Sequence, residues 1–232
     1  MRFDTTVKDI ISQADDVKSF RFPRPTDFVY KPGQFIVITI RSKEHTLTKH
    51  FSFSSSPTEK DVIEFTKKLT GHEFSNALDA LTVGDWTAID GPYGNFTFEG
   101  EYEKVGMLSG GIGITPLRSM CKYCTDMKLG TSIVLLYGNR TEENIVFRED
   151  LEQMQRQNKN LRVVFTLDEP SEGWSGEIGR ISVDMLKRMV PDFAKRVFYT
   201  CGPPGMVHAM SRLLTHFKIH EQQIRTESFA GY

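Results

Sequence analysis

A glycine-rich segment, SGGIGITP at residues 109–116, is the feature that most constrains the fold of this chain. It follows the apolar run VGML at residues 105–108 and precedes a helical pattern over residues 117–127. A strand, a glycine turn and a helix start together form an anion site, because glycines let the backbone approach a phosphate and the free N–H groups of a helix favour negative charge. We therefore expect a phosphate-bearing ligand here, although a glycine-rich turn in a protein core is the alternative for this segment taken alone.

Two further segments define the ligands more closely. The sequence KHFSFSSSP occupies residues 49–57, and CGPPGM occupies residues 201–206 after a second apolar strand pattern at 197–200. In this order and at this spacing, the three segments resemble the ferredoxin–NADP reductase superfamily, and the resemblance covers nearly the whole chain. It implies that the first segment holds a flavin, that the glycine turn holds the pyrophosphate of a nicotinamide nucleotide, and that the Cys-Gly segment lies beside the nicotinamide.

The residue pattern changes near residue 100. Before it, short β-rich runs cover residues 5–11, 17–22, 34–40, 50–54, 62–66 and 85–89, with one short helix near 73–80. This pattern predicts a small closed antiparallel β-barrel with six strands, which the resemblance implies is a Greek key.

After residue 100, strand patterns alternate with helical ones. Strands are predicted at 105–108, 132–138, 162–166, 197–200 and 224–229, and helices at 115–127, 146–157, 182–189 and 204–217. Such alternation indicates an α/β domain with a parallel sheet, whose ligands lie at the carboxyl ends of the strands. We therefore predict two domains, an FAD-binding β-barrel over residues 1–100 and an NAD(P)-binding α/β domain over residues 101–232.

Composition limits the other possibilities. The 232 residues carry a net charge of −1, which gives no reason to expect binding to nucleic acid. No apolar run approaches the roughly 20 residues that a transmembrane helix needs, and no signal peptide is expected. The three cysteines argue against a disulfide framework, so a cytoplasmic location is predicted. No metal site is expected.

The flavin segment offers three kinds of group. Lys49 and Phe51 lie on one side of the predicted strand and Ser52 on the other. A flavin needs a cation for its pyrophosphate, a flat apolar surface for its ring, and a polar group near the reactive N5. An edge strand with an exposed serine is the alternative. The superfamily usually has Arg and Tyr where Lys49 and Phe51 stand, so the flavin is expected to bind somewhat more loosely.

A second flavin element is predicted at residues 70–76, TGHEFSN. The glycine and the helix start suit a phosphate, and the resemblance implies that they bind the FAD pyrophosphate, which favours FAD over FMN. A capped connector helix is the alternative. The predicted flavin-binding residues are Lys49, His50, Phe51, Ser52, Phe53, Ser54, Thr66, Lys67, Lys68, Gly71, Phe74 and Ser75.

The resemblance also implies the reacting groups. Cys201 is expected to pack against the nicotinamide without acting as a nucleophile, and Glu227 fits the place of a nearby acid. Ser52, Cys201 and Glu227 are therefore the predicted catalytic residues. The predicted nicotinamide-site residues are Gly110, Gly111, Gly113, Ile114, Thr115, Asn139, Arg140, Asp168, Cys201, Gly202, Pro203 and Met206, with Phe229 or Tyr232 as the aromatic that covers the flavin.

The predicted reaction is hydride transfer from NAD(P)H to FAD, followed by electron transfer to a separate ferredoxin, cytochrome or oxygenase component. NADH is favoured over NADPH, because Leu167 and Asp168 stand where NADPH-using relatives carry a Ser-Arg pair, although Arg140 could offset the repulsion. Reduction of free flavin or of a small oxidant is an alternative, as is a redox sensor without turnover. Cys121 and Cys124 lie inside a predicted helix and are expected to be structural.

Overall fold

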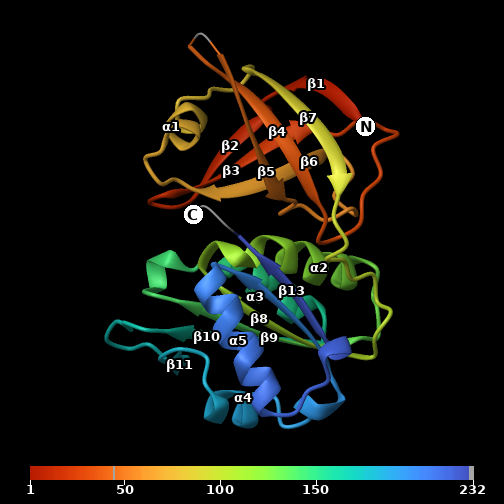
Figure 1. Cartoon of the computed structure of the whole chain (residues 1–232), viewed down its shortest axis with the longest axis vertical. Helices are drawn as coiled ribbons and strands as arrows, with labels where there is room; N and C mark the ends of the chain where they lie inside the picture. The colour runs from red at the N-terminus through yellow and green to blue at the C-terminus, as the bar shows by residue number, and fades with distance from the viewer. Residues whose placement is uncertain (44, 230–232) are drawn as a thin grey trace.

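The computed structural model describes residues 1–43 and 45–229, which form a β domain stacked on an α/β domain (Figure 1). The β domain has a sheet in the order β1-β7-β4-β5 and a second in the order β2-β3-β6, and its neighbouring strands are antiparallel. Its elements are β1 (Arg2–Thr6), β2 (Asp9–Ala14), β3 (Val17–Pro23), β4 (Phe35–Ser42), β5 (His45–Ser52), β6 (Val62–Lys68), α1 (Glu73–Asp79) and β7 (Trp86–Tyr93).

One predicted strand is wrong in detail. The run over residues 5–11 divides into β1 and β2, because the chain passes from one sheet to the other at Val7 and Lys8. The Val7 N–H donates to the Asp85 carbonyl at 2.9 Å, and the Lys8 N–H donates to the Arg21 carbonyl at 2.7 Å. The backbone groups at this turn are therefore satisfied outside the strand ladders.

Phenylalanine rings fill the space between the two sheets. Phe65 on β6 stacks on Phe51 of β5, with ring centroids 4.6 Å apart, and on Phe20 of β3 at 5.3 Å. An isolated bridge pairs Phe53 with Phe65 and so joins the two sheets. Burying one such side chain contributes about 1.5–3 kcal/mol, so this aromatic cluster is a main source of the domain's stability.

The α/β domain has a parallel six-stranded sheet in the order β11-β10-β9-β8-β12-β13. Its elements are β8 (Lys104–Gly110), α2 (Ile114–Asp126), β9 (Ser132–Asn139), α3 (Arg148–Gln157), β10 (Leu161–Leu167), β11 (Glu177–Ile178), α4 (Val183–Met189), β12 (Val197–Gly202), α5 (Pro204–His216) and β13 (Ile224–Ser228). The two-residue strand β11 was not predicted. The predicted fold class, an antiparallel β domain followed by a parallel α/β domain, is confirmed.

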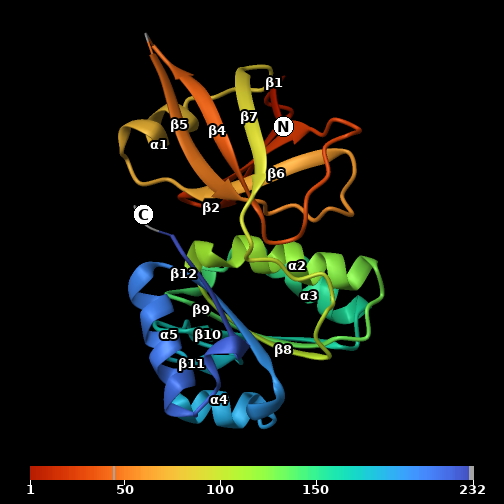
Figure 2. The same cartoon turned by 45° about the vertical axis from the view of Figure 1, so that its right-hand side comes forward.

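Helices cover both faces of the parallel sheet. Side chains of α2 and α3 share one apolar core with the sheet, and side chains of α4 and α5 share another. Figure 2 shows α2 and α3 between the sheet and the β domain, with α4 and α5 on the far face. Within residues 1–43 and 45–229, none of the helices has the length and apolar character that a membrane span requires.

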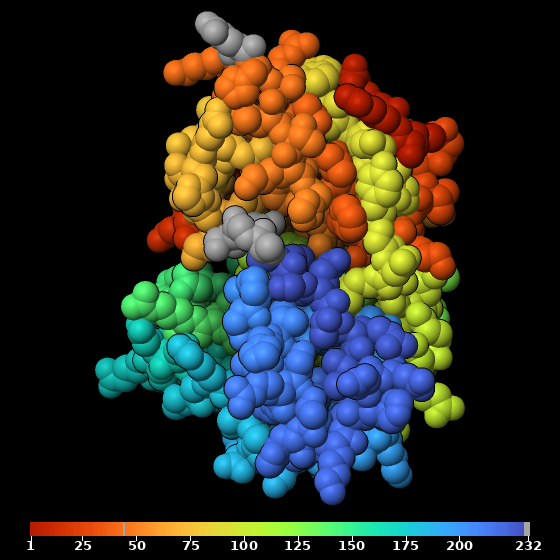
Figure 3. Space-filling model, viewed as in Figure 1, coloured from red at the N-terminus to blue at the C-terminus, as the bar shows by residue number. Residues whose placement is uncertain are grey.

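The strand order places the ligand edge against the β domain. From β8 the chain moves through β9 to β10 on one side, and it then returns to add β12 on the other side of β8. This reversal creates a crevice at the carboxyl ends of β8 and β12. In the space-filling view, the orange and yellow β domain rests directly on the green and blue α/β domain (Figure 3).

Candidate active site

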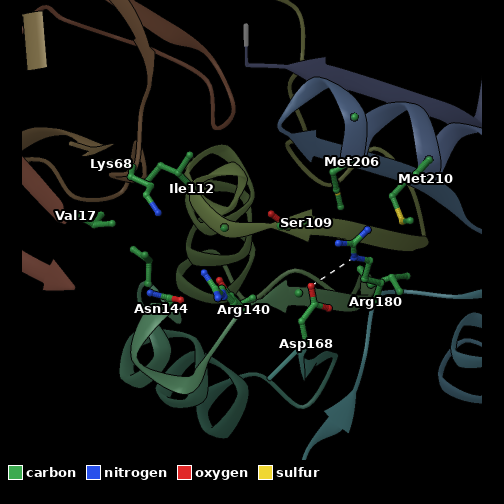
Figure 4. A pocket seen from close by; sticks show the side chains of 18 of the residues that line it. Val17, Lys68, Ser109, Ile112, Arg140, Asn144, Asp168, Arg180, Met206 and Met210 are labelled. Atoms are coloured by element: carbon green, nitrogen blue, oxygen red, sulfur yellow. Dashed lines mark hydrogen bonds and ion pairs between the residues drawn. The ribbon is translucent and has the colours of Figure 1, made fainter. Parts of the chain in front are cut away.

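A cavity of about 470 Å³ opens at the carboxyl ends of the parallel strands (Figure 4). Its lining includes the predicted residues Gly110, Gly111, Asn139, Arg140, Asp168 and Met206. Asp16, Val17 and Lys68 line it from the β domain, so the cavity lies between the two domains. Its position is the one where open α/β sheets bind nucleotides.

The glycine turn packs tightly against the end of β12. A Cβ atom on Gly113 would lie 2.2 Å from the Cys201 carbonyl oxygen and 2.5 Å from the Gly202 Cα, so any side chain there would clash with backbone. Gly111 has a φ of +52°, and its carbonyl accepts a hydrogen bond from the Tyr137 hydroxyl at 2.9 Å. The turn is therefore held in shape by the protein itself, as a preorganised anion site requires.

Three predicted residues of this segment, Gly113, Ile114 and Thr115, support the turn and do not line the cavity. Ile114 is fully buried in the core, and the buried Thr115 hydroxyl donates to the Ile112 carbonyl at 3.3 Å. Ser109, which was not among the predicted ligand residues, does line the cavity, together with Ile112. The apolar Met206 and Met210 form the opposite wall (Figure 4).

Asn139 provides a test of whether a nucleotide suits this cavity. Its side chain is 8% exposed and lines the cavity, and within the described chain neither polar atom of its amide has a partner at normal hydrogen-bond length. Leaving such a buried group unsatisfied costs about 1–3 kcal/mol. A ligand that carries hydroxyl and phosphate groups would satisfy it, so the residues present fit a nicotinamide nucleotide.

The outer end of the cavity carries two ion pairs. The Asp168 carboxylate lies 3.4 Å from the guanidinium of Arg180, a residue that was not predicted, and both lie at the cavity edge in Figure 4. Arg140 pairs with Glu169 at 3.0 Å. Both arginines near the predicted ribose end therefore already face a carboxylate.

The three predicted catalytic residues come together at a second cavity. The Ser52 hydroxyl, at the end of β5, donates to Glu227 Oε2 at 3.2 Å, and Cys201 Sγ lies 4.0 Å from the same oxygen. Cys201 and Glu227 are register partners on the adjacent strands β12 and β13. The cavity has a volume of about 230 Å³ and is lined by Ser52 and Glu227 with Phe35, Val37, His50, Phe51, Ser228 and Phe229.

Burial sets the protonation of this cluster. It raises the pKa of Glu227 to about 7, with the hydrogen bond from Ser52 acting in the opposite direction. Burial and the nearby Glu227 carboxylate raise the pKa of the Cys201 thiol well above its usual range. Cys201 is therefore a neutral thiol rather than a nucleophile, and Glu227 is poised to change its charge near neutral pH.

Comparison with known proteins agrees with this arrangement. Residues 3–98 match the oxidoreductase FAD-binding domain family, and residues 107–212 match the oxidoreductase NAD-binding domain family. NADH-cytochrome b5 reductase 1 of Aspergillus terreus is 31% identical over 214 residues, which are 87% of this chain and 72% of that protein. The chain belongs to the ferredoxin–NADP reductase superfamily.

Other members of the superfamily extend the comparison. The glycine betaine monooxygenase reductase subunit of Chromohalobacter salexigens is 31% identical over 96% of this chain, but the chain spans only 62% of that subunit. The cytochrome b5 reductase domain of Ulva prolifera nitrate reductase has the same fold, with a TM-score of 0.85, 24% identity, and coverage of 98% of this chain and 97% of that one.

The flavin end of this superfamily member carries three neighbouring lysines. Lys67 on β6 is buried, and burial, followed by the nearby Lys49 and Lys68, lowers its pKa to about 8. Its ammonium donates to the Lys68 carbonyl at 2.6 Å. Because like charges gathered at a partly buried position favour an anion, Lys49 and Lys67 fit a pyrophosphate.

Lys68 belongs to the other site. It pairs with Asp16 at 3.0 Å and lines the nucleotide cavity, where Figure 4 places it opposite Asn144 and Arg140. Its side chain therefore faces the nicotinamide nucleotide cavity, while its backbone remains predicted to line the flavin pyrophosphate. The reason is strand alternation, which sends neighbouring side chains of β6 to opposite sides.

Several other predicted flavin residues point into the protein. Phe51 is buried against Phe65 and Phe74, and it also lines the cavity at Ser52 and Glu227. The Ser54 hydroxyl donates to Glu64 at 2.7 Å, and the Thr66 hydroxyl donates to Ser54 at 2.9 Å. Phe53 is likewise buried and stacks on Tyr30. The side chains of Phe53, Ser54 and Thr66 hold the barrel together and leave backbone groups for a ligand.

The remaining predicted residues are placed as follows. His50 is exposed. Gly71 lies at an exposed turn and has a φ of +73°. The Ser75 hydroxyl accepts a hydrogen bond from the Thr70 N–H at 2.8 Å. Pro203 is exposed at the start of α5, and the Phe229 N–H donates to the Gly202 carbonyl at 3.0 Å. Tyr232 lies outside the described residues.

Cys121 and Cys124 are buried free thiols on α2. Burial raises the pKa of Cys124 to about 12, and the Cys121 thiol donates to the Met107 sulfur at 3.7 Å. Both are therefore poor redox groups, in line with a structural role. In the described part of the chain, no group of three or more His, Cys, Asp or Glu residues is placed to hold a metal ion.

Proposed function

We propose that this protein is an FAD-dependent oxidoreductase that takes a hydride from NADH and delivers electrons to a separate acceptor. The observation that carries the proposal is the meeting of Ser52, Cys201 and Glu227 at the domain interface. When bound, FAD supplies a ring that accepts a hydride and can release electrons one at a time. The protein supplies binding, orientation and the exclusion of water.

The residues divide these tasks between the two domains. Lys49 and Lys67 would hold the flavin pyrophosphate, with the Gly71 turn nearby. The N–H groups of the glycine turn and the Asn139 amide would hold the nicotinamide nucleotide. At the reacting end, the Ser52 hydroxyl offers a hydrogen-bond donor, and Glu227 Oε2 can hold or release a proton near pH 7. Fixed donors of this kind act most strongly where water is excluded.

Charge at the outer end of the cavity supports NADH as the substrate. The carboxylate of Asp168 repels a 2′-phosphate and can accept hydrogen bonds from ribose hydroxyls. Arg140 and Arg180 are both engaged by carboxylates, at 3.0 and 3.4 Å. To bind a 2′-phosphate, Arg140 or Arg180 would therefore first have to break its ion pair.

The acceptor is proposed to be a redox protein. The relatives include reductase subunits of glycine betaine monooxygenase and propane 2-monooxygenase, and NADH-cytochrome b5 reductases. We propose domain limits of 1–100 and 101–232, which fit the two family matches. A cytoplasmic location is proposed from the three free thiols.

Steady-state assays test the choice of acceptor. The FAD-loaded protein is mixed with NADH and, in separate reactions, a ferredoxin, a cytochrome and free riboflavin. Faster turnover with one of the proteins supports the proposal, whereas faster turnover with riboflavin would favour a flavin reductase. Absence of turnover with all three would favour a sensor that binds both nucleotides without reaction.

A further inference from the structure

Arg118 on α2 is a buried cation that joins the two domains. Its side chain is 5% exposed and lies one helical turn beyond the glycine turn. On the β domain, Glu59 approaches it with two contacts, at 2.5 and 3.3 Å. On its own domain, Asp150 in the first turn of α3 accepts from its Nε at 2.6 Å. One guanidinium therefore binds a carboxylate from each domain.

The same helix also holds the backbone of the flavin segment. The Arg118 guanidinium donates to the Ser54 carbonyl at 2.9 Å, and the neighbouring Ser119 hydroxyl donates to the Ser55 carbonyl at 2.6 Å. Glu59 closes this loop by accepting from the Ser56 N–H at 2.6 Å. The chain that follows Ser52 is thus fastened to α2 at two successive carbonyls and one carboxylate.

The other side of Arg118 leads to the nucleotide cavity. Its guanidinium lies 5.6 Å from the centre of the Phe147 ring, at the start of α3. Asn144 and Val146, just before this ring, line the nucleotide cavity. Arg118 itself lines neither that cavity nor the one at Ser52 and Glu227. Arg118 therefore connects the segments that form the walls of the two cavities, and its own side chain lies outside both cavities.

Stability is a poor explanation for this arrangement. Moving an arginine out of water costs several kcal/mol, and well-packed apolar residues often replace a buried ion pair without loss of stability. A guanidinium does offer fixed directions to its partners, which an apolar contact does not. The ion pairs of Arg118 with Glu59 and Asp150 therefore fix the relative positions of these groups more than they raise the free energy of unfolding.

We propose that Arg118 is a positioning residue that sets the flavin segment against the nicotinamide half of the active site. This inference rests on the proposed function. Its action runs through the Glu59 ion pair, so the rate of hydride transfer depends on that pair, whereas the affinities for FAD and NADH do not. A misplacement of about 1 Å between reacting groups can lower a rate by about 100-fold.

Two matched variants separate positioning from mere burial of charge. Glu59→Gln removes the carboxylate across the interface, and Asp150→Asn removes the one within the α/β domain. Each leaves Arg118 paired with one carboxylate, so neither strands a buried charge, and both are expected to fold. Arg196→Lys is the control, because Arg196 is a 6% exposed arginine that binds Asp192 at 2.7 Å and the Val105 carbonyl at 2.9 Å within one domain.

The FAD-loaded variants are mixed anaerobically with NADH, and the limiting rate of flavin bleaching is measured together with the dissociation constants of NADH and FAD. We expect Glu59→Gln to lower the limiting rate by about tenfold or more, while both dissociation constants change by less than about threefold. Asp150→Asn and Arg196→Lys should lower the rate by less than about threefold. Equal losses in Glu59→Gln and Asp150→Asn, or no loss in either, would overturn the proposal.

Hydrogen–deuterium exchange in the flavin-free protein gives a second readout. We expect exchange over residues 54–59 to rise in Glu59→Gln and to stay unchanged in Arg196→Lys. Unchanged exchange over residues 54–59 in both variants would contradict the proposal that Arg118 and Glu59 hold this segment in place. If the unaltered protein is not bleached by NADH, the proposed function fails, while the exchange comparison still decides whether Arg118 holds this segment.

Discussion

The Ser52 hydroxyl donates a hydrogen bond of 3.2 Å to the Glu227 carboxylate, although the two residues are 175 positions apart and belong to different domains. Neither domain therefore contains the proposed reacting site by itself. The bond also links a group from the flavin segment to a group beside Cys201.

Ser52→Ala should slow flavin reduction more than it weakens FAD binding. The hydroxyl is a fixed donor where charge changes during hydride transfer, and such a donor acts mainly in the transition state. We expect the single-turnover reduction rate to fall by about tenfold or more, with a much smaller change in the FAD dissociation constant. Thr48→Ala, on the same strand but hydrogen-bonded to Thr39, is the control. An unaltered reduction rate in Ser52→Ala would remove Ser52 from the catalytic group.

Glu227 should make stability depend on pH in the flavin-free protein. Its folded pKa of about 7 lies above the value of 4.5 expected in the unfolded chain, so the folded state binds the extra proton between these values. This contribution is complete below pH 4.5 and is lost as the pH rises through 7. Relative to Glu227→Gln, the wild type should lose about 3 kcal/mol of unfolding free energy over this range. If the unfolding free energies of the two proteins changed with pH in the same way, the pKa of Glu227 would not be raised in the folded state.

Lys67 should couple FAD binding to pH. Its pKa of about 8 in the ligand-free protein should rise when a pyrophosphate binds beside it. Below pH 8 the ammonium is charged in both states, whereas above pH 8 binding must first restore its proton. The FAD dissociation constant should therefore increase above pH 8 by up to about tenfold per pH unit. Lys67→Met should bind FAD more weakly and lose this slope, and an identical slope in the variant would place the flavin phosphates elsewhere.

NADH should be preferred to NADPH at low ionic strength, as judged by kcat/KM. Asp168→Thr should lower the ratio of kcat/KM for NADH to kcat/KM for NADPH by about tenfold, because it removes the carboxylate that repels a 2′-phosphate. Glu169→Gln should narrow it as well, since it releases Arg140 from its partner. Arg180→Gln should widen it by exposing the Asp168 charge. A native preference for NADPH would mean that the arginines dominate the carboxylates.

Local sequence patterns were sufficient for the fold class, whereas the grouping of Ser52, Cys201 and Glu227 is implied by the family resemblance. Cys201 and Glu227 lie at the carboxyl ends of adjacent parallel strands, which meet at one edge of the sheet, whereas Ser52 comes from an antiparallel strand of the other domain. The side chains of Lys67 and Lys68 face opposite sides of β6 because side chains alternate along a strand, and this alternation can be read from the sequence.

Other features could not be read from local sequence. Asp16 enters the nucleotide cavity from a turn in the β domain, and Arg180 reaches Asp168 from twelve positions away, so only the folded chain brings them there. Phe51 and Ser54 turn inward because the aromatic core and Glu64 provide better partners than an open surface does. Arg118 follows a recognised motif, but its role depends on Glu59, which lies 59 positions earlier.

Anaerobic stopped-flow mixing shows whether this protein carries a hydride from NADH to bound FAD. The protein is loaded with FAD, freed of excess flavin and oxygen, and mixed with a small excess of NADH while flavin absorbance is followed. We expect rapid bleaching in a single turnover with formation of one NAD⁺ per flavin. Flavin that stays oxidised with both NADH and NADPH, although FAD is fully bound, would contradict this expectation.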